Sequence, residues 1–434
     1  MSALAEVKLW NRTIGAVFLE EGDSVATFDY DPEFRHSGIE VSPLRMPLGS
    51  QQFRFPALPR ETFHGLPGLL ADALPDRFGN ALIDAWLARQ GREAASFHAV
   101  ERLCYTGTRG MGALEFFPTQ GPRECKSHPI EVERLAALAS DILQQHDHAH
   151  AELSNNDDPE ALRDILQVGT SAGGARSKAV IAWNPGTQEV RSGQVKTDPG
   201  FEHWLLKFDG VSGNRDKEME APKGYGLIEY AYSLMAKDAG LKMAPCRLLQ
   251  ENGRSHFMTQ RFDRTEKGAK LHMQSLGSLA HFDFHQAGAY GYEQCMQVMR
   301  QLGMPSSSIE QQFRRMVFNI LARNQDDHVK NIAFLMNKQG AWSLAPAFDV
   351  TYSYQPSGTW TFAHQMTLQG KRDDFSMEDF RACGRTVGLV RGRAERMVRE
   401  VQEVVAGWPT YAERVGLEPG LCQSIDENLR RQLA

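Results

Sequence analysis

The most informative stretch of this chain is Asn324-Gln325-Asp326-Asp327-His328-Val329-Lys330-Asn331, which Phe348-Asp349-Val350 follows after an apolar run. It combines an Asp, an Asn five residues later and a second Asp downstream, the residue types that phosphoryl-transfer sites use. One carboxylate can position or deprotonate an attacking hydroxyl, whereas the Asn and the later Asp can hold magnesium against nucleotide phosphates. The spacing therefore predicts a magnesium–nucleotide site built on Asp326, Asn331 and Asp349.

The segment between these residues has the pattern of a β-hairpin. Residues 332–336 are apolar like a short strand, residues 337–340 have turn composition, and residues 342–347 lead back. Such a hairpin would bring Asp349 near Asn331. The competing interpretation is that Asp and Asn merely cap turns, which they do often. Two features favour the site: the polar cluster lies between a helical segment and an apolar strand, and a second Asp follows the hairpin.

Composition places the chain among soluble globular proteins. Its 434 residues are enough for two or three domains, and 41% hydrophobic with 24% charged residues is ordinary for such proteins. The net charge of −6 gives no sign of the clustered basic face that direct nucleic-acid binding needs. The six cysteines are scattered without a C-x-x-C pair, which argues against a disulfide scaffold or a structural zinc site. With neither a signal-peptide pattern nor a membrane span in the sequence, we expect a cytoplasmic, reduced protein.

The order of patterns along the chain predicts a strand-rich first half, a helix-rich second half and a ligand cleft between them. Helical spacing over residues 66–89 is interrupted by Pro75, so a break is expected at residues 73–76. Helical composition also extends over residues 127–166 and 227–240, and helices are expected for most of the chain beyond Asp263. Strand patterns occur at residues 6–10, 13–19, 25–30, 178–183, 203–208, 247–249 and 256–260.

A loop rich in small residues, residues 169–178, leads into one of these strands. Its glycines would let backbone N–H groups approach phosphate oxygens, and Arg176 or Lys178 could add positive charge. It is not a Walker A loop, because Ala175 stands where that motif needs Lys. The alternative is an ordinary flexible loop.

Lys207 lies within the apolar strand Trp204-Leu205-Leu206-Lys207-Phe208. A lone buried ammonium is costly, so this lysine needs an anionic partner such as nucleotide phosphates or a helix carboxylate, for which Glu229 is the candidate. The alternative is an edge lysine whose ammonium reaches solvent.

The segment from Phe257 to Arg264 lies where strands give way to helices. A segment that joins two lobes has free backbone N–H and C=O groups that can pair with adenine, and we expect Met258 and Phe262 to pack on the adenine ring. The alternative is a plain edge strand.

These pieces, in this order, resemble the HipA family of serine/threonine kinases, the toxin half of bacterial toxin–antitoxin pairs. The resemblance covers most of the chain, from the N-terminal signatures to the catalytic loop. The matching motifs are Leu66-Pro67, Leu74-Pro75-Asp76-Arg77-Phe78-Gly79, Gly110-Met111-Gly112-Ala113-Leu114-Glu115-Phe116, the loop from Asn324 to Asn331, Ala345-Pro346 with Phe348-Asp349, and His364-Gln365-Met366 with Leu368, Gly370 and Lys371.

The resemblance implies a two-lobed, protein-kinase-like α+β fold with a strand-rich N-terminal lobe and a helical C-terminal lobe. Residues 1–118 would form an N-terminal subdomain and residues 119–259 the rest of the N-terminal lobe, including the phosphate loop. Residues 260–434 would form the C-terminal lobe.

The resemblance also implies roles for individual residues. Asp326 would be the catalytic Asp, Asn331 and Asp349 the magnesium ligands, and Ser171 the autophosphorylated serine whose modification ejects the loop and shuts the kinase off. Two departures from the family concern Gln260, which stands where some members have an acidic residue, and the loop sequence Gly-Gly-Ala-Arg-Ser-Lys. Contacts to ATP would come from Gly173, Gly174, Ala175, Arg176, Ser177, Lys178, Lys207, Gln260, Arg261, Phe262, His328, Lys330, Asn331 and Asp349.

The implied cofactors are ATP and Mg2+, and the implied substrate is a protein serine or threonine, with an aminoacyl-tRNA synthetase as the target. The implied partner is a HipB-like antitoxin with a helix-turn-helix domain, through which DNA would mainly be bound; no membrane partner is expected. Two alternatives remain: a small-molecule kinase of the aminoglycoside or choline type, and an inactive binding protein that acts as a corepressor.

Overall fold

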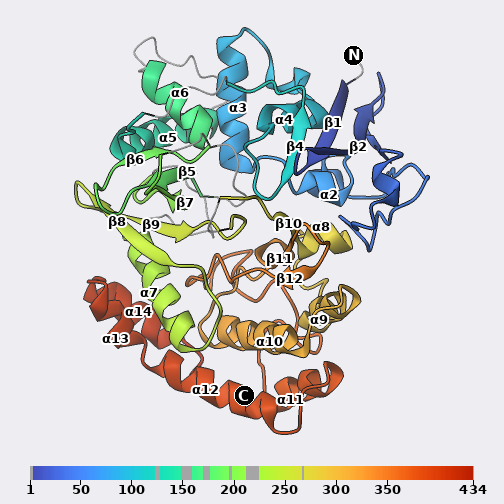
Figure 1. The fold of residues 1–434 in the computed structure, drawn as a ribbon. Coiled ribbons are helices and arrows are strands. Elements are labelled where there is room, and N and C mark those ends of the chain that lie inside the picture. Colours follow the sequence, from blue (N-terminus) through green and yellow to red (C-terminus); the bar gives the residue numbers. More distant parts are fainter. Residues whose placement is uncertain are drawn as a thin grey trace.

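The computed structural model describes residues 3–122, 128–147, 159–169, 176–194, 198–211, 224–265 and 268–433. The chain is arranged in two lobes, with two sheets and the first six α-helices in the upper lobe of Figure 1 and mostly helices in the lower lobe. The predicted division into a strand-rich and a helical lobe is confirmed. The upper lobe contains more helix than the strand patterns alone suggested.

The N-terminal sheet has the strand order β3-β2-β1-β4, and all of its pairs are antiparallel. Its strands are β1 (Ala3–Leu9), β2 (Arg12–Leu19), β3 (Thr27–Tyr30) and β4 (Leu114–Phe117). Alternate residues of β1 are buried, as a sheet with one covered face requires. The first three strands confirm the sequence prediction, and β4 joins the sheet only after the helices η1 (Phe34–His36), α1 (Arg60–Phe63), α2 (Gly68–Ala71), α3 (Arg77–Arg89), η2 (Ala94–Ser96) and α4 (Ala99–Thr106).

The expected helix break before Asp76 is present. Helix α2 ends at Ala71, and α3 begins at Arg77 with Asp76 as its N-cap. The Asp76 side chain accepts a hydrogen bond from the backbone N–H of Gly79 at 2.7 Å, which satisfies one of the free donors of the first turn.

The second sheet has five antiparallel strands in the order β6-β5-β7-β9-β8. They are β5 (Lys178–Trp183), β6 (Val190–Ser192), β7 (Glu202–Lys207), β8 (Cys246–Glu251) and β9 (Arg254–Gln260). Helices α3, α5 (Val132–Asp147) and α6 (Pro159–Val168) share an apolar core with one face of this sheet. Because side chains alternate along a strand, Ala179 and Leu206 enter that core while Lys178 and Lys207 lie on the opposite face.

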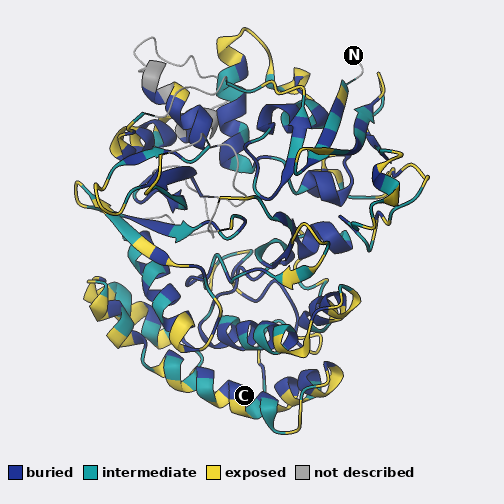
Figure 2. Cartoon of the chain, in the orientation of Figure 1, coloured by how far each residue is buried: buried dark blue, intermediate teal, exposed yellow. Residues whose placement is uncertain are grey.

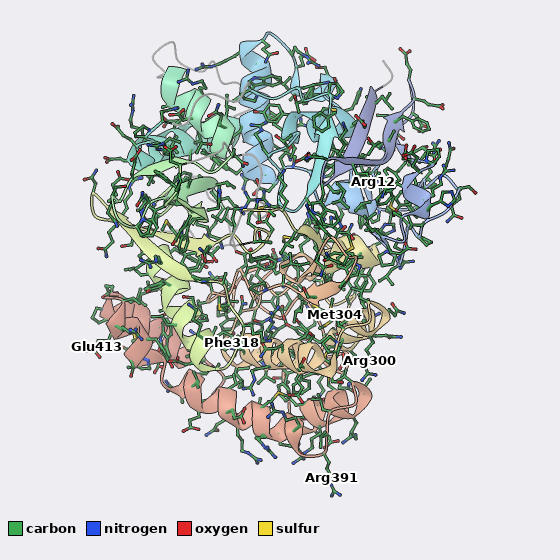
Figure 3. All side chains as sticks on the ribbon, viewed as in Figure 1. Arg12, Arg300, Met304, Phe318, Arg391 and Glu413 are labelled. Carbon is green, nitrogen blue, oxygen red and sulfur yellow. The ribbon has the colours of Figure 1, made fainter. Side chains whose placement is uncertain are left out.

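The lower lobe is built around the buried helix α10 (Ser306–Leu321), and Phe318 of this helix lies in its core (Figure 3). The outer helix α12 (Arg393–Ala406) is buried on one side, where it contacts α10 and α11, and has exposed residues on the other (Figure 2). The remaining helices are α7 (Tyr225–Asp238), α8 (Leu276–Ala280), α9 (Tyr292–Gln301), η3 (Val329–Asn331), α11 (Met377–Thr386), α12 (Arg393–Ala406), α13 (Trp408–Arg414) and α14 (Pro419–Asn428).

A small sheet of order β10-β11-β12 stands at the top of the lower lobe. Strands β11 (Ala333–Met336) and β12 (Trp342–Leu344) form the predicted hairpin, with Phe334 opposite Leu344. Strand β10 (His272–Ser275) was not predicted, since its four residues are mostly polar and its partner β11 lies far along the chain. Among the described residues, no helix is long and apolar enough to cross a membrane.

The N-terminal sheet is tied to the junction of the two lobes through Asp263. This fully buried carboxylate lies 2.7 Å from the Arg261 guanidinium and 2.6 Å from that of Arg264, and it accepts the backbone N–H of Gly112 at 2.7 Å. Gly112 has a φ of +78°, a left-handed conformation that glycine adopts without strain. The motif of residues 110–116, which contains Gly112, therefore has a structural role at the lobe junction.

We expect Asp263→Asn to lower the free energy of unfolding at pH 7 by about 3–5 kcal/mol, because it leaves two buried guanidinium groups without their counter-charge. Urea unfolding followed by circular dichroism would measure the change. The matched control is Asp29→Asn, which breaks the half-exposed pair with Arg35 and should cost less than about 1 kcal/mol. Equal losses in the two variants would contradict the structural role of Asp263.

Candidate active site

Lys207 at the end of β7 is buried and paired with two carboxylates. Its ammonium lies 2.6 Å from Oε1 of Glu229 on α7 and in direct contact with Oδ1 of Asp349. Burial lowers the pKa of Lys207, but Asp349 and Glu229 outweigh it and hold the pKa above its ordinary value. The lysine is thus charged and held in place, and the expected partnership with Glu229 is present. The side chain is only 9% exposed, so the alternative of an edge lysine that extends into solvent is wrong.

Asp349 reaches this lysine because the β11–β12 hairpin returns the chain to the lobe junction. The backbone N–H of Ala345 donates to the carbonyl of Ala333 at 3.0 Å, so the residues after β12 run beside the residues before β11. Asp349 has a φ of +52°, a left-handed conformation that Asp adopts more readily than most residues. Asn331, at the end of η3, precedes the same hairpin. The predicted magnesium ligands therefore lie at one end of the hairpin.

Asp326 lies in the loop between α10 and η3 and is mostly buried. The Asn331 side-chain amide donates to its backbone carbonyl at 2.8 Å, which closes the loop on itself. The indole N–H of Trp360 donates to Oδ1 of Asp326 at 2.9 Å, and Nε2 of His328 lies 3.7 Å from the same oxygen. Sequence reasoning missed Trp360, because no local pattern links it to the loop. The indole N–H therefore occupies one of the acceptor positions of this carboxylate.

Asp327 anchors the loop through contacts with α9 and with the segment that contains His364. Its Oδ2 accepts the Tyr292 hydroxyl at 2.5 Å and lies 2.8 Å from Nδ1 of His364, while its Oδ1 accepts the backbone N–H of Gln365 at 2.7 Å. Burial raises the pKa of Asp327, but His364 and the hydrogen bonds outweigh it and hold the pKa below its ordinary value. Asp327 was part of the quoted stretch without an assigned role, and Tyr292 was missed. The structure also explains the His364-Gln365 motif, which this carboxylate holds against the loop.

Only the second half of the predicted phosphate loop lies within the described residues. Ser171, Gly173, Gly174 and Ala175 fall outside them. The Arg176 guanidinium stacks on the Tyr225 ring, 3.1 Å from its centroid, at the start of α7. The carbonyl of Ser177 accepts the backbone N–H of Phe208 at 3.1 Å, and Lys178 forms an ion pair with Asp76 at 3.3 Å.

The hinge differs from expectation in two respects. The backbone N–H groups of Gln260 and Arg261 are not free, because they donate to the carbonyls of Pro245 and His203 at 2.9 and 3.0 Å. The expected packing of Met258 on adenine is wrong, since this side chain points into the core on the helix-covered face of the sheet. Within the described part of the chain, no hydrogen bond is made by the backbone N–H of Phe262.

Phe262 borders a small apolar cluster beneath the hinge. Its ring lies 5.6 Å from that of Phe348, centroid to centroid. The cluster is completed by Leu271, Met273, Ala333, Leu335 and Ala345. A flat aromatic base would find apolar contacts here.

The donor set at the hairpin end fits magnesium. Asp349 offers a carboxylate and Asn331 an amide oxygen, and Mg2+ is commonly held by one or two such protein oxygens with water and substrate phosphates completing its shell. Among the described residues, no group of three or more His, Cys, Asp or Glu side chains is arranged to hold a metal by itself. A metal at this position would therefore depend on nucleotide phosphates.

Two parts of the chain match the models of known protein families. Residues 5–117 match the model of the HipA N-terminal domain, and residues 170–408 match that of the HipA-like C-terminal domain. The chain belongs to the HipA family. The solved HipA of Shewanella oneidensis MR-1, in complex with HipB and operator DNA, covers 98% of this HipA-family chain with a TM-score of 0.67 and 16% identity, and 94% of that chain is matched. This likeness confirms the expected two-lobed fold along nearly the whole length.

Two other relatives match less of the protein. The Sinorhizobium fredii (strain NBRC 101917 / NGR234) protein named "Putative kinase Y4mE" is 25% identical over 186 residues, which are 40% of this chain and 44% of that protein. The chain thus aligns with less than half of the length of this relative. The Helicobacter pylori proinflammatory kinase CtkA matches 52% of this chain and 88% of its own at 12% identity, but its TM-score of 0.34 is too low to support an argument.

We expect Asp327→Asn to lower the free energy of unfolding at pH 7 by about 2–4 kcal/mol, since it puts an amide NH2 where a buried carboxylate oxygen accepts the Tyr292 hydroxyl and contacts the His364 ring. Because the folded-state pKa of Asp327 is lowered from 3.8, this contribution is present above about pH 4 and is lost as the pH falls through the lower folded value. Denaturant unfolding of both proteins at pH 7 and at pH 3 would measure it. Tyr292→Phe, which removes one donor to Asp327 and the acceptor of the Asn319 amide, should cost about 1–2 kcal/mol; a loss larger than that of Asp327→Asn would contradict the anchoring role of the carboxylate.

Proposed function

We propose that this HipA-family protein is an ATP- and magnesium-dependent kinase that phosphorylates serine or threonine in a protein. The observation that carries the proposal is the contact of Lys207 with both Glu229 and Asp349. Kinases use a strand lysine paired with a helix carboxylate to hold nucleotide phosphates, next to an Asp that binds metal. Here the three residues come from β7, α7 and the segment after β12, and they meet beside the loop that carries Asp326.

In the proposed reaction, Asp326 accepts the proton of the acceptor hydroxyl as its oxygen bonds to the γ-phosphorus of ATP. The bond from that phosphorus to the bridging oxygen breaks, and ADP leaves with the electron pair. Lys207 holds the phosphates, and Asn331 with Asp349 would hold the metal. Magnesium, when bound, neutralises charge on the phosphates. The Trp360 indole N–H donates to Oδ1 of Asp326, so the acceptor hydroxyl would share this carboxylate with it.

The adenine would lie on the apolar cluster at Phe262 and Phe348, with the Phe262 N–H as a main-chain donor. This arrangement tolerates Gln260 at a position that is acidic in some family members, because the hydrogen bond comes from the backbone. His328 and Lys330, in the same loop as Asp326, extend the site towards the nucleotide. The Lys330 ammonium lies 4.7 Å from the centroid of the Phe284 ring, which fixes its side chain.

Membership in the HipA family supports the remaining parts of the proposal. The protein would act as a growth-inhibiting toxin, with an aminoacyl-tRNA synthetase as its target, and Ser171 would be the autophosphorylated residue. A HipB-like antitoxin would be its partner, as in the Shewanella complex, and the acidic net charge suits DNA binding mainly through that partner.

We expect Asp326→Asn to fold and to bind ATP but to lose phosphoryl transfer by several orders of magnitude, since it removes the proton acceptor. Intact mass and phosphopeptide mapping after incubation with ATP and magnesium would show the loss. Asp198→Asn, an exposed carboxylate, is the control and should transfer normally. Full activity in Asp326→Asn would refute the assignment, and turnover of ATP with label only on an added aminoglycoside or choline would favour a small-molecule kinase.

Ser171→Ala should abolish the phosphate gained by the chain itself while leaving transfer to a protein acceptor intact, because the residue is proposed as a product site and not as part of the machinery. Phosphopeptide mapping of this variant beside Thr170→Val, a neighbouring hydroxyl, would locate the modification. If the label persists in Ser171→Ala and disappears in Thr170→Val, the modified residue is Thr170.

A further inference from the structure

Two buried lysines face each other across strands β5 and β7. Lys178 and Lys207 are direct partners in the antiparallel register, and both lie on the sheet face that is turned away from the helix-covered core. They are only 2% and 8% exposed. Like charges opposite one another in a sheet destabilise it, and buried ammonium groups need counter-charges. Each of these lysines therefore requires a carboxylate of its own.

Lys207 has Glu229 and Asp349, whereas the carboxylate beside Lys178 comes from the N-terminal domain. Oδ2 of Asp76 lies 3.3 Å from the Lys178 ammonium, with side-chain exposures of 7% and 2%. The other oxygen, Oδ1, caps helix α3 by accepting the backbone N–H of Gly79. The cap thus fixes the direction of the carboxylate, and the carboxylate in turn fixes the lysine.

The charge state of Asp76 suits this arrangement. Burial raises the pKa of Asp76 to about 6, with Lys178 and the Gly79 hydrogen bond opposing the rise. The carboxylate is therefore ionised at neutral pH in spite of its burial. The charge of Lys330 also lowers this pKa.

We propose that Asp76 is a positioning residue for Lys178, and that the lysine it holds acts beside Lys207 on the nucleotide phosphates. The arrangement is like that of Glu229 and Lys207, because in both pairs a carboxylate from a helix holds the ammonium of a strand lysine in place. The N-terminal domain of the HipA family then contributes directly to nucleotide binding in this protein. The inference rests on the proposed function, because it concerns the same nucleotide.

A purely structural ion pair would make a different prediction. It would dock α3 on the sheet, so its loss would lower stability and leave the affinity of the folded protein for nucleotide unchanged. A positioning role changes that affinity in protein that is still folded. Binding of magnesium–ATP by folded variants therefore separates the two roles.

The deciding substitution is Asp76→Asn, because Asn caps a helix as well as Asp does and removes only the charge. We expect its Kd for magnesium–ATP, measured by titration calorimetry, to rise roughly tenfold or more, as loss of a well-held charged contact to phosphate implies. The control is Glu418→Gln, which removes a capping carboxylate from the remote helix α14 and should bind as the wild type does.

Lys178→Gln tests the same inference, whether or not Asp76→Asn folds. It should weaken magnesium–ATP binding by at least as much, and adding Asp76→Asn to it should have little further effect, since both act through one ammonium. Wild-type affinity in Lys178→Gln, or in folded Asp76→Asn, would overturn the inference while leaving the proposed function standing. If the wild-type chain itself binds no magnesium–ATP, the proposed function fails first.

Discussion

The arrangement of this molecule depends on the need to neutralise a buried lysine at the junction of its lobes. Lys207 ends a strand of the upper lobe, Glu229 lies on helix α7, and Asp349 follows the hairpin of the lower lobe. An ammonium in this position is tolerated only when carboxylates surround it. The three segments are therefore held in one relative position, which is also the position on which the proposed nucleotide site depends.

The same constraint is met elsewhere at the junction by buried carboxylates that also bind a distant part of the chain. Asp263 neutralises Arg261 and Arg264 and binds the Gly112 backbone of the N-terminal domain. Asp327 holds His364 and the chain that follows it. The N-terminal domain is thus joined to the kinase-like lobes by charged contacts as well as by apolar packing, which explains why its short motifs carry Gly and Asp.

Local patterns predicted several elements well. Alternating residues identified β1 to β3, Pro75 marked the break before α3, and the apolar runs around residues 337–340 indicated the β11–β12 hairpin. The pairing of Lys207 with Glu229 also followed from the cost of burying a lone charge. The predictions were wrong where a segment distant in the sequence determines the local structure. The polar strand β10 forms because β11 offers it hydrogen bonds, and Met258 turns away from the hinge because the helices cover that face.

The sequence by itself determined the strand and helix periodicities and the spacing of Asp326, Asn331 and Asp349. These features depend on neighbours a few residues away, whose geometry the local backbone sets. Only the tertiary structure decided which donors contact those carboxylates, and that Asp349 also pairs with Lys207 and Asp76 with Lys178. Trp360 reaches Asp326, and Asp76 reaches Lys178, through contacts between segments far apart in the chain. Such contacts leave no periodic trace, because packing of whole elements brings them together.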